Sequence, residues 1–209
     1  MEPSSTHDRI LEAALKVFSR HGYTGATTKA IAREAGVNEV TLFRHFGNKQ
    51  KLFTEMINRY SALPHIEAAR ADRRTPFEKR IRELAGRAMR LLEERRELIA
   101  ILLSEGSRHP KQAKLILEGG PARILERLTL FFEEAQTTGE IRGLDPQCTA
   151  RAFMGMMFFY VIFQKIMPGE TLFPTDPKRV ENTFIEILLR GLLPIRTKPK
   201  SKDSSGRRK

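Results

Sequence analysis

The amino-acid sequence predicts an all-α protein, and three observations support this fold class. Apolar residues recur at three- and four-residue spacing nearly throughout the chain, as they do along the buried face of a helix. Several of these periodic segments begin at threonine, asparagine or proline, and some end at glycine, the residue types that start and stop helices. Nothing in the spacing is typical of a strand-rich chain. We therefore expect a bundle of helices.

The first helix is expected from about Thr6 to Arg20. Thr6 suits the N-cap position, and Asp8 suits the first turn, where the helix dipole favours negative charge. Gly22 follows this segment and can take the left-handed backbone conformation that ends a helix.

Two short helices are expected within residues 25–46. Thr27 or Thr28 caps the first of them, and Asn38 caps the second. Gly36 makes the turn between them, because glycine accepts the backbone angle that a turn of three or four residues imposes. The spacing fits a helix-turn-helix frame that starts at Thr28. Its inward positions hold the small or apolar residues that close packing requires: Ile31, Ala32, Ala35, Val37 and Leu42.

A longer helix is expected to start near Lys49 and to be limited or kinked at Pro64. The rest of the chain is larger and more apolar, and prolines open most of its expected helices. Those helices are expected at about 76–102, 111–117, 122–137, 146–167 and 178–193, with a proline-rich loop at 168–177.

Charge and missing motifs limit the classes of function. The chain has 37 Lys and Arg against 25 Asp and Glu, a net charge of +12, which favours polyanionic partners. Its longest uncharged apolar stretch, residues 152–164, has 13 residues, whereas a membrane span needs about 20. No signal peptide is visible and Cys148 is the single cysteine, so we expect a cytoplasmic protein. The sequence contains no phosphate-binding glycine loop, nucleophile elbow or metal-spaced histidines, so no enzyme, cofactor or metal is expected.

The segment at residues 27–53, TTKAIAREAGVNEVTLFRHFGNKQKLF, closely resembles the DNA-binding signature of TetR-family transcriptional regulators. The resemblance extends over residues 10–57, and further downstream it is only to a layout of helices. It implies a homodimer with two N-terminal three-helix heads and a C-terminal helical body for effector binding and dimerisation. The expected domains are the helix-turn-helix head at 1–50, the body at 51–195 and a basic, disordered tail at 196–209.

The resemblance implies that residues 38–46 form the recognition helix in the major groove of DNA. The residues expected to read bases are Lys29, Asn38, Glu39, Val40, Thr41 and Arg44. Contacts to phosphate are expected from Thr28, Thr41, His45 and Lys49. Arginine and lysine can contact guanine, and asparagine can contact adenine. Glu39 could instead only complement the helix N-terminus, and His45 could be an ordinary surface residue.

Phe43 departs from the family pattern, which usually has tyrosine at this position. A phenylalanine keeps the packing and a contact to a methyl group, but it lacks the hydroxyl that bonds to phosphate. We expect the loss to be about 1 kcal/mol per half-site.

The segment at residues 152–167 is apolar all round, so both of its faces must be covered. The resemblance implies that one face meets a partner subunit and the other lines a ligand cavity. The candidate effector-binding residues are Met89, Leu92, Leu103, Phe131, Phe153, Met157, Phe158 and Tyr160. Met and Phe suit an adaptable apolar pocket, although each of these residues could equally pack in the core. Such walls favour an apolar or aromatic effector over a sugar or an amino acid.

The function expected from the sequence is that of a ligand-responsive repressor. A dimer would bind a double-stranded, pseudo-palindromic operator and be released by a small, largely apolar effector, with no membrane involved. Two alternatives stay open. The first is a regulator of the same fold without a small-molecule effector, which a large apolar cavity in the body would count against. The second is a small helical enzyme with a vestigial head, which a catalytic pair of polar groups in that cavity would support.

Overall fold

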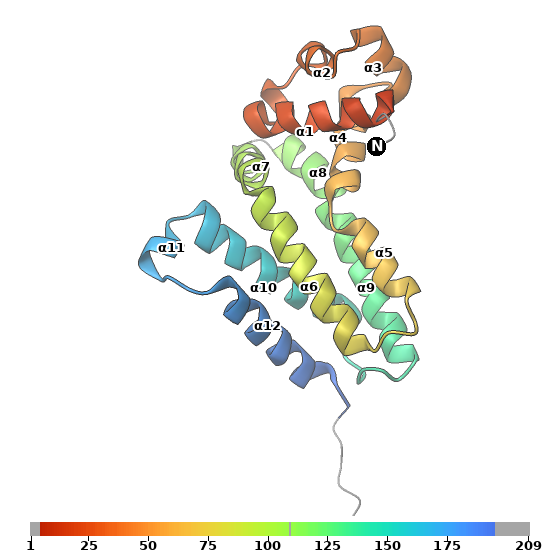
Figure 1. Ribbon diagram of the computed structural model, residues 1–209, viewed down its shortest axis with the longest axis vertical. Helices are drawn as coiled ribbons and strands as arrows, with labels where there is room; N and C mark the ends of the chain where they lie inside the picture. The colour runs from red at the N-terminus through yellow and green to blue at the C-terminus, as the bar shows by residue number, and fades with distance from the viewer. Residues whose placement is uncertain (1–4, 109, 195–209) are drawn as a thin grey trace, which may run out of the picture.

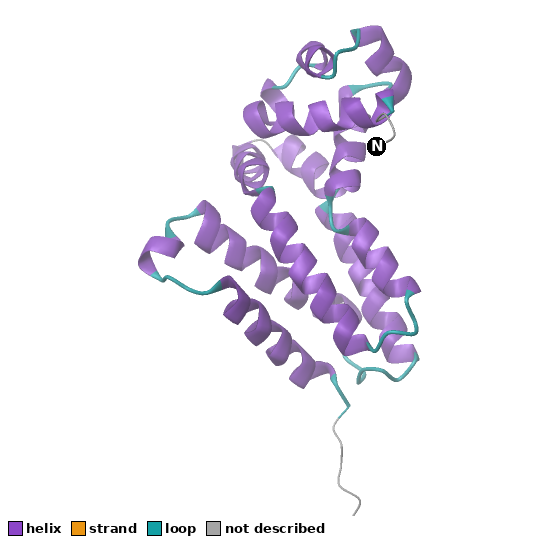
Figure 2. Cartoon of the chain, in the orientation of Figure 1, coloured by secondary structure: helices purple, strands orange, loops and turns teal. Residues whose placement is uncertain are grey.

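The computed structural model describes residues 5–108 and 110–194, and within these ranges the chain forms helices without any strand (Figures 1 and 2). The predicted all-α fold class is therefore confirmed. The predicted basic tail, 196–209, lies outside the described residues. In chain order the helices are α1 (Thr6–Gly25), α2 (Thr28–Glu34), α3 (Glu39–Phe46), α4 (Lys49–Tyr60), α5 (Leu63–Ala71), α6 (Phe77–Glu94), α7 (Arg96–Arg108), α8 (Pro110–Gly119), α9 (Pro121–Thr137), α10 (Pro146–Val161), the π-helix η1 (Ile162–Ile166), α11 (Gly169–Leu172) and α12 (Pro177–Leu192).

The first four helices form a head, at the top of Figure 1, around one hydrophobic core. The rings of Phe18 in α1 and Phe53 in α4 meet edge to face, with their centroids 5.0 Å apart. Leu98 and Leu102 of α7 are buried in the same core. The head is therefore continuous with α7, and α4 belongs to the core of the head although residue 51 was expected to begin the body.

The body has a second core, which is built mainly by α5, α6, α9, α10 and α12. Aromatic rings dominate its centre: Phe77 of α6 stacks on Phe131 of α9 at 5.4 Å between centroids, and Phe132 meets Phe131 edge to face at the same distance. In Figure 1 these long helices run below the head, with α12 along one side. Among the described helices, none has the length and apolar character needed to cross a membrane.

The local signals for helix starts are confirmed at most positions. Thr27 and Asn38 each accept a backbone N–H through the side-chain oxygen at the start of α2 and α3, as predicted, and Asn48, which was not predicted as a cap, does the same at the start of α4. One cap was misplaced: Ser5, and not Thr6, caps α1. Ser5 has extended backbone and its hydroxyl accepts the N–H of Asp8 at 3.1 Å, whereas Thr6 is already helical.

The structure differs from the expected helices in three places. The helix expected at 76–102 is broken at Arg95, whose Nε donates to the carbonyl of Tyr60 at 3.2 Å, so α6 and α7 are separate. A further helix, α5, fills the segment from Leu63 to Ala71. The helix expected to reach Met167 ends at Val161 and continues as η1, and α11 lies inside the predicted loop.

Candidate nucleic-acid interface

Helices α2 and α3 form the helix-turn-helix, and Gly36 sets the turn between them. Gly36 has a φ of 65°, which favours glycine. The guanidinium of Arg9, in α1, donates through Nη2 to the carbonyls of Ala35 at 2.7 Å and Gly36 at 3.2 Å. Ile31 and Leu42 are fully buried beneath the turn. The turn is therefore fixed against α1, and α3 is held in one orientation.

Helix α3 is bounded by an asparagine and a glycine. The Oδ1 atom of Asn38 accepts the N–H of Val40 at 2.9 Å, and Gly47, with a φ of 76°, follows the last residue. This capping bond uses only the amide oxygen of Asn38. The side-chain nitrogen carries separate donors, which are the atoms that an adenine contact would need.

One face of α3 is exposed and carries both apolar and basic side chains. Val40 is 74% exposed and Phe43 is 43% exposed, and Arg44 and His45 are exposed beside them. Thr41 is half-buried, and Lys29 is exposed on α2. Val and Phe at this face can pack against a thymine methyl group.

Two of the predicted DNA contacts bind each other. The hydroxyl of Thr28 donates to Oε1 of Glu39 at 2.5 Å, and this bond joins the start of α2 to the start of α3. Glu39 is half-buried as a result. A contact from either residue to DNA stays a prediction, and it would have to be made in addition to this bond or in place of it.

Lys49 is held by the chain itself. Its ammonium donates to the carbonyls of Ala26 at 2.7 Å and Thr24 at 3.5 Å, and it lies 4.6 Å from the centroid of the Tyr23 ring. Partial burial lowers the pKa of Lys49 below its ordinary value, and the negative charge of Glu105 opposes that shift. Sequence reasoning assigned Lys49 to phosphate and missed this structural role, because its partners are backbone carbonyls more than twenty residues earlier.

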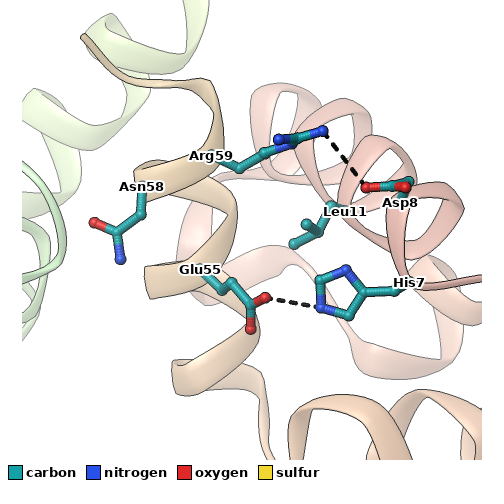
Figure 3. A pocket seen from close by; sticks show the side chains of 6 residues that line it. All are labelled: His7, Asp8, Leu11, Glu55, Asn58 and Arg59. Carbon is teal, nitrogen blue, oxygen red and sulfur yellow. Dashed lines mark ion pairs between the residues drawn. The ribbon is translucent and has the colours of Figure 1, made fainter. Parts of the chain in front are cut away.

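The N-terminal end of α1 brings a second histidine to the recognition helix. The ring of His7 stacks on Phe46 at 4.7 Å between centroids and lies 6.0 Å from the ring of His45. Beside it is a pocket of about 400 Å³ (Figure 3), lined by His7, Asp8, Leu11, Glu55, Asn58 and Arg59. Two side-chain contacts join α1 to α4 there: His7 Nε2 to Glu55 Oε1 at 2.8 Å and Arg59 Nη2 to Asp8 Oδ1 at 3.7 Å. The sequence alone left these histidines scattered.

The eight candidate effector residues lie in different environments. Five are buried in the core of the body: Met89, Phe131, Phe153, Met157 and Tyr160. Leu92 is partly buried against that core. Phe158 is half-buried, and Leu103, on α7, is 43% exposed. The pocket in Figure 3 and a second one on the head between α1 and Glu34 are lined by none of these eight. Their role in binding a ligand stays a prediction.

Two family models match the chain. Residues 10–56 match the model described as bacterial regulatory proteins, tetR family. Residues 79–190, more than half of the chain, match the model described as AefR-like transcriptional repressor, C-terminal domain. The two matches fall on the head and on the body, in the order that the structure has them.

Individual proteins are similar to the chain in sequence or in fold. The transcriptional repressor NicS of Pseudomonas putida is 30% identical over 165 residues, which cover 74% of this chain and 75% of that protein. The Bacillus subtilis regulator FadR, solved with stearoyl-CoA, has a TM-score of 0.63 at 22% identity and covers 88% of this chain and 98% of its own. SmeT, the repressor of a Stenotrophomonas maltophilia multidrug efflux pump, solved with triclosan, has a TM-score of 0.67 at 21% identity, covering 95% and 97%.

Proposed function

The chain belongs to the TetR family of bacterial transcriptional regulators, and on that basis we propose that it is a repressor that binds a pseudo-palindromic operator as a homodimer. A small, largely apolar effector releases it. The head, whose core includes α4, is the DNA-binding part, the helical body that follows it is the effector-binding and dimerisation part, and residues 196–209 are a basic tail. The repressor role draws support from NicS and from the repressor family matched by the body.

The exposed face of α3 carries the proposal for DNA binding. Arg44 and His45 are exposed there, and the caps at Asn38 and Gly47 fix where the helix begins and ends. Arg9 and the core beneath α2 hold this face rigidly. A rigid helix with exposed basic and apolar side chains suits insertion into the major groove, where arginine reads guanine and apolar groups meet thymine. Lys29, on α2, extends the basic surface.

Exposed apolar side chains on α10 and α12 support the homodimer. Phe159 is 65% exposed and Ile187 is 59% exposed, and both helices otherwise pack their apolar residues into the body. Side chains of this size, on neighbouring helices, favour burial against a second copy. In a two-fold dimer the same patch is used by both subunits, which gives a four-helix interface.

The effector is proposed to be apolar or aromatic because the candidate site is walled by aromatic and methionine side chains. Met89, Phe131, Phe153, Met157 and Tyr160 are packed together in the core, so a ligand would have to separate them. Methionine side chains repack at low cost. FadR and SmeT, which share this fold, were solved with stearoyl-CoA and with triclosan.

One observation favours the alternative without a small-molecule effector. The five buried candidates share one core cluster, and the ring of Phe132 links two of them: its centroid lies 5.4 Å from that of Phe131 and 6.2 Å from that of Phe153. A core that stays closed would leave the regulator constitutive or dependent on a protein partner. Thermal-shift screening of a mixed ligand library separates the two proposals, because a compound that binds the folded chain stabilises it. Apolar compounds that stabilise the chain and also release operator DNA would support the effector. A library without such compounds would support the alternative. An enzyme is not favoured, because the curated relatives are transcriptional regulators.

Selection from random double-stranded DNA tests the proposed function. The full chain is mixed with random fragments, and the bound DNA is recovered and sequenced. We expect an inverted repeat whose half-site centres lie about 34–36 Å apart along the duplex, or a multiple of that distance. Recovery of fragments with no shared sequence would contradict the proposal. The genomic positions of the selected sequence would then show which genes are regulated.

A further inference from the structure

A carboxylate of the body holds the loop that leads into the helix-turn-helix. We use the name α1–α2 loop for residues 22–27, which are the end of α1 from its break at Gly22 onward and the two residues that precede α2. Glu105, on α7, accepts the backbone N–H of Tyr23 through Oε2 and the N–H of Thr24 through Oε1, both at 2.8 Å. Hydrogen bonds to an ionised acceptor are stronger than neutral ones. Glu105 is separated from this loop by about eighty residues of sequence, so the contact joins two distant parts of the chain.

The backbone of the α1–α2 loop is shaped for this approach. Gly22 has a φ of 68° and a ψ of −175°, which interrupts α1 and turns the following N–H groups toward α7. A Cβ at Gly22 would lie 2.7 Å from Oε1 of Glu105 and 2.8 Å from Cγ2 of Ile101. Both distances are shorter than van der Waals contact. Glycine is therefore required at this position by its conformation and by the closeness of Glu105.

The same loop is also bound by a positive group, the ammonium of Lys49 at the start of α4. Lys49 donates to the carbonyls of Thr24 and Ala26, while Glu105 accepts from the N–H groups of Tyr23 and Thr24. The next residue along the chain, Thr27, caps α2. The segment that leads into the helix-turn-helix is therefore bound on both sides. Its backbone carbonyls accept from Lys49 of α4, and its backbone N–H groups donate to Glu105 of α7.

We propose that Glu105 is a positioning residue for operator binding, which fixes the orientation of the head relative to the body. This inference rests on the proposed function. A dimer contacts two half-sites at once, so the heads must present α3 at a set separation and angle. If Glu105 is lost, Leu98 and Leu102 of α7 still pack in the core of the head, so each head keeps its own fold and its own contacts to DNA. Without the two hydrogen bonds to Glu105, the pair of heads is less restrained and samples more orientations. Binding to both half-sites then costs more ordering entropy.

The proposal is tested with Glu105→Gln, which keeps one acceptor oxygen and places an NH₂ group opposite a backbone N–H. Two DNA probes are used: the complete operator selected as above, and a duplex with one of its half-sites. We expect operator affinity to fall by roughly fivefold or more, a typical coupling between sites, and half-site affinity to be unchanged. Hydrogen exchange at the N–H groups of Tyr23 and Thr24 should become faster. The control is Glu97→Gln, an exposed glutamate on the same helix, which should match the native chain.

Each outcome decides a different question. If the native chain, which retains Glu105, selects no specific DNA, the proposed function is wrong, and the positioning role that rests on it is overturned as well. If the native chain binds its operator and Glu105→Gln binds both probes like the native chain, the positioning role is wrong. Equal losses on both probes would mean that Glu105 only supports the fold of the head, which also overturns it. If Glu105→Gln does not fold by circular dichroism, Glu105→Asp, shorter by one methylene, replaces it in the same comparison.

Discussion

At the scale of single residues, Arg80 shows what a sequence pattern cannot reveal. Its guanidinium is 4% exposed and donates to both carboxylate oxygens of Glu140, at 2.7 and 2.6 Å, and to the carbonyl of Ala69 at 3.0 Å. It also lies 5.4 Å from the centroid of the Phe131 ring. In the sequence Arg80 is one of many charges on α6, and its acidic partner is sixty residues away. Only the folded chain brings the pair together.

Removal of Glu140 should destabilise the chain strongly. Glu140→Ala leaves the guanidinium of Arg80 buried without its counter-charge, and we expect a loss of about 3 kcal/mol in the free energy of unfolding. Glu78→Ala is the control, because Glu78 forms an exposed pair with Arg82 on the same helix. It should cost less than about 0.5 kcal/mol. Urea unfolding measures both. Similar losses for the two variants would contradict this account of Arg80.

His65 should make the chain less stable as the pH falls below neutral. Its pKa lies below the ordinary 6.5, because burial disfavours the charged ring and because Arg87 and Arg90 repel it. The unfolded chain therefore binds the proton more readily, so stability is complete above the unfolded pKa and is lost as pH falls through the folded one. We expect His65→Gln to remove this decrease in the free energy of unfolding between pH 7 and 5, as measured by urea unfolding at several pH values. Glu134 and Asp145 also have lowered pKa values, but they titrate below 4.5 and 3.8. If His65→Gln keeps the native dependence of stability on pH, His65 is not the group responsible.

At the scale of helices, most starts were predictable and the breaks were not. Starts depend on nearby residues: Pro121 and Pro146 open α9 and α10 as expected, because proline suits the first turn. Breaks depend on distant partners. Lys165, in η1, pairs with Glu93 of α6 at 3.3 Å and Glu170 of α11 at 3.1 Å, so the change from α10 to η1 occurs where tertiary contacts hold the chain. No spacing rule contains such contacts.

The two asparagine caps offer a matched test of α3. Asn38→Ala and Asn48→Ala each remove a capping oxygen, from α3 and α4 respectively. Each should lower the free energy of unfolding by about 1 kcal/mol. Only Asn38→Ala should also change which base is preferred at one position of each half-site, because Asn38 lies on the proposed reading surface. Repeating the DNA selection with both variants measures this. A changed preference with Asn48→Ala alone would contradict the placement of that surface.

At the scale of the whole molecule, the order of head and body was predictable, and the residue at which the head ends was not. The helix-turn-helix spacing located α2 and α3, and the family resemblance indicated which residues of this segment are exposed. Val40 and Arg44 are exposed as expected, whereas Glu39 and Thr41 are half-buried. The pairing of Thr28 with Glu39 and the capture of Lys49 by backbone carbonyls were missed, because both depend on how three helices cross. Leu98 also contributes to the core of the head from well inside the expected body.

The dimer should be lost when its exposed apolar patch is charged. Phe159→Glu places a carboxylate at the proposed two-fold interface, where burial of an unpaired charge is costly. We expect a folded monomer in sedimentation at micromolar concentration, whereas the native chain sediments as a dimer. Leu117→Glu is the control, because Leu117 is 55% exposed on α8, which packs mainly against α4, α7 and α9. A native chain that is itself a stable, folded monomer would rule the dimer out.

The most direct test of the central claim, that α3 reads the operator, is a titration with Arg44→Ala. The native chain and the variant are titrated with the selected operator and with all its single-base variants, and Arg82→Ala, on the body, is the control. We expect Arg44→Ala to lose about 1–3 kcal/mol of binding free energy and to stop discriminating bases at one position in each half-site. Arg82→Ala should bind like the native chain. If Arg44→Ala keeps the native affinity and the native preference on every sequence, α3 is not the surface that reads DNA.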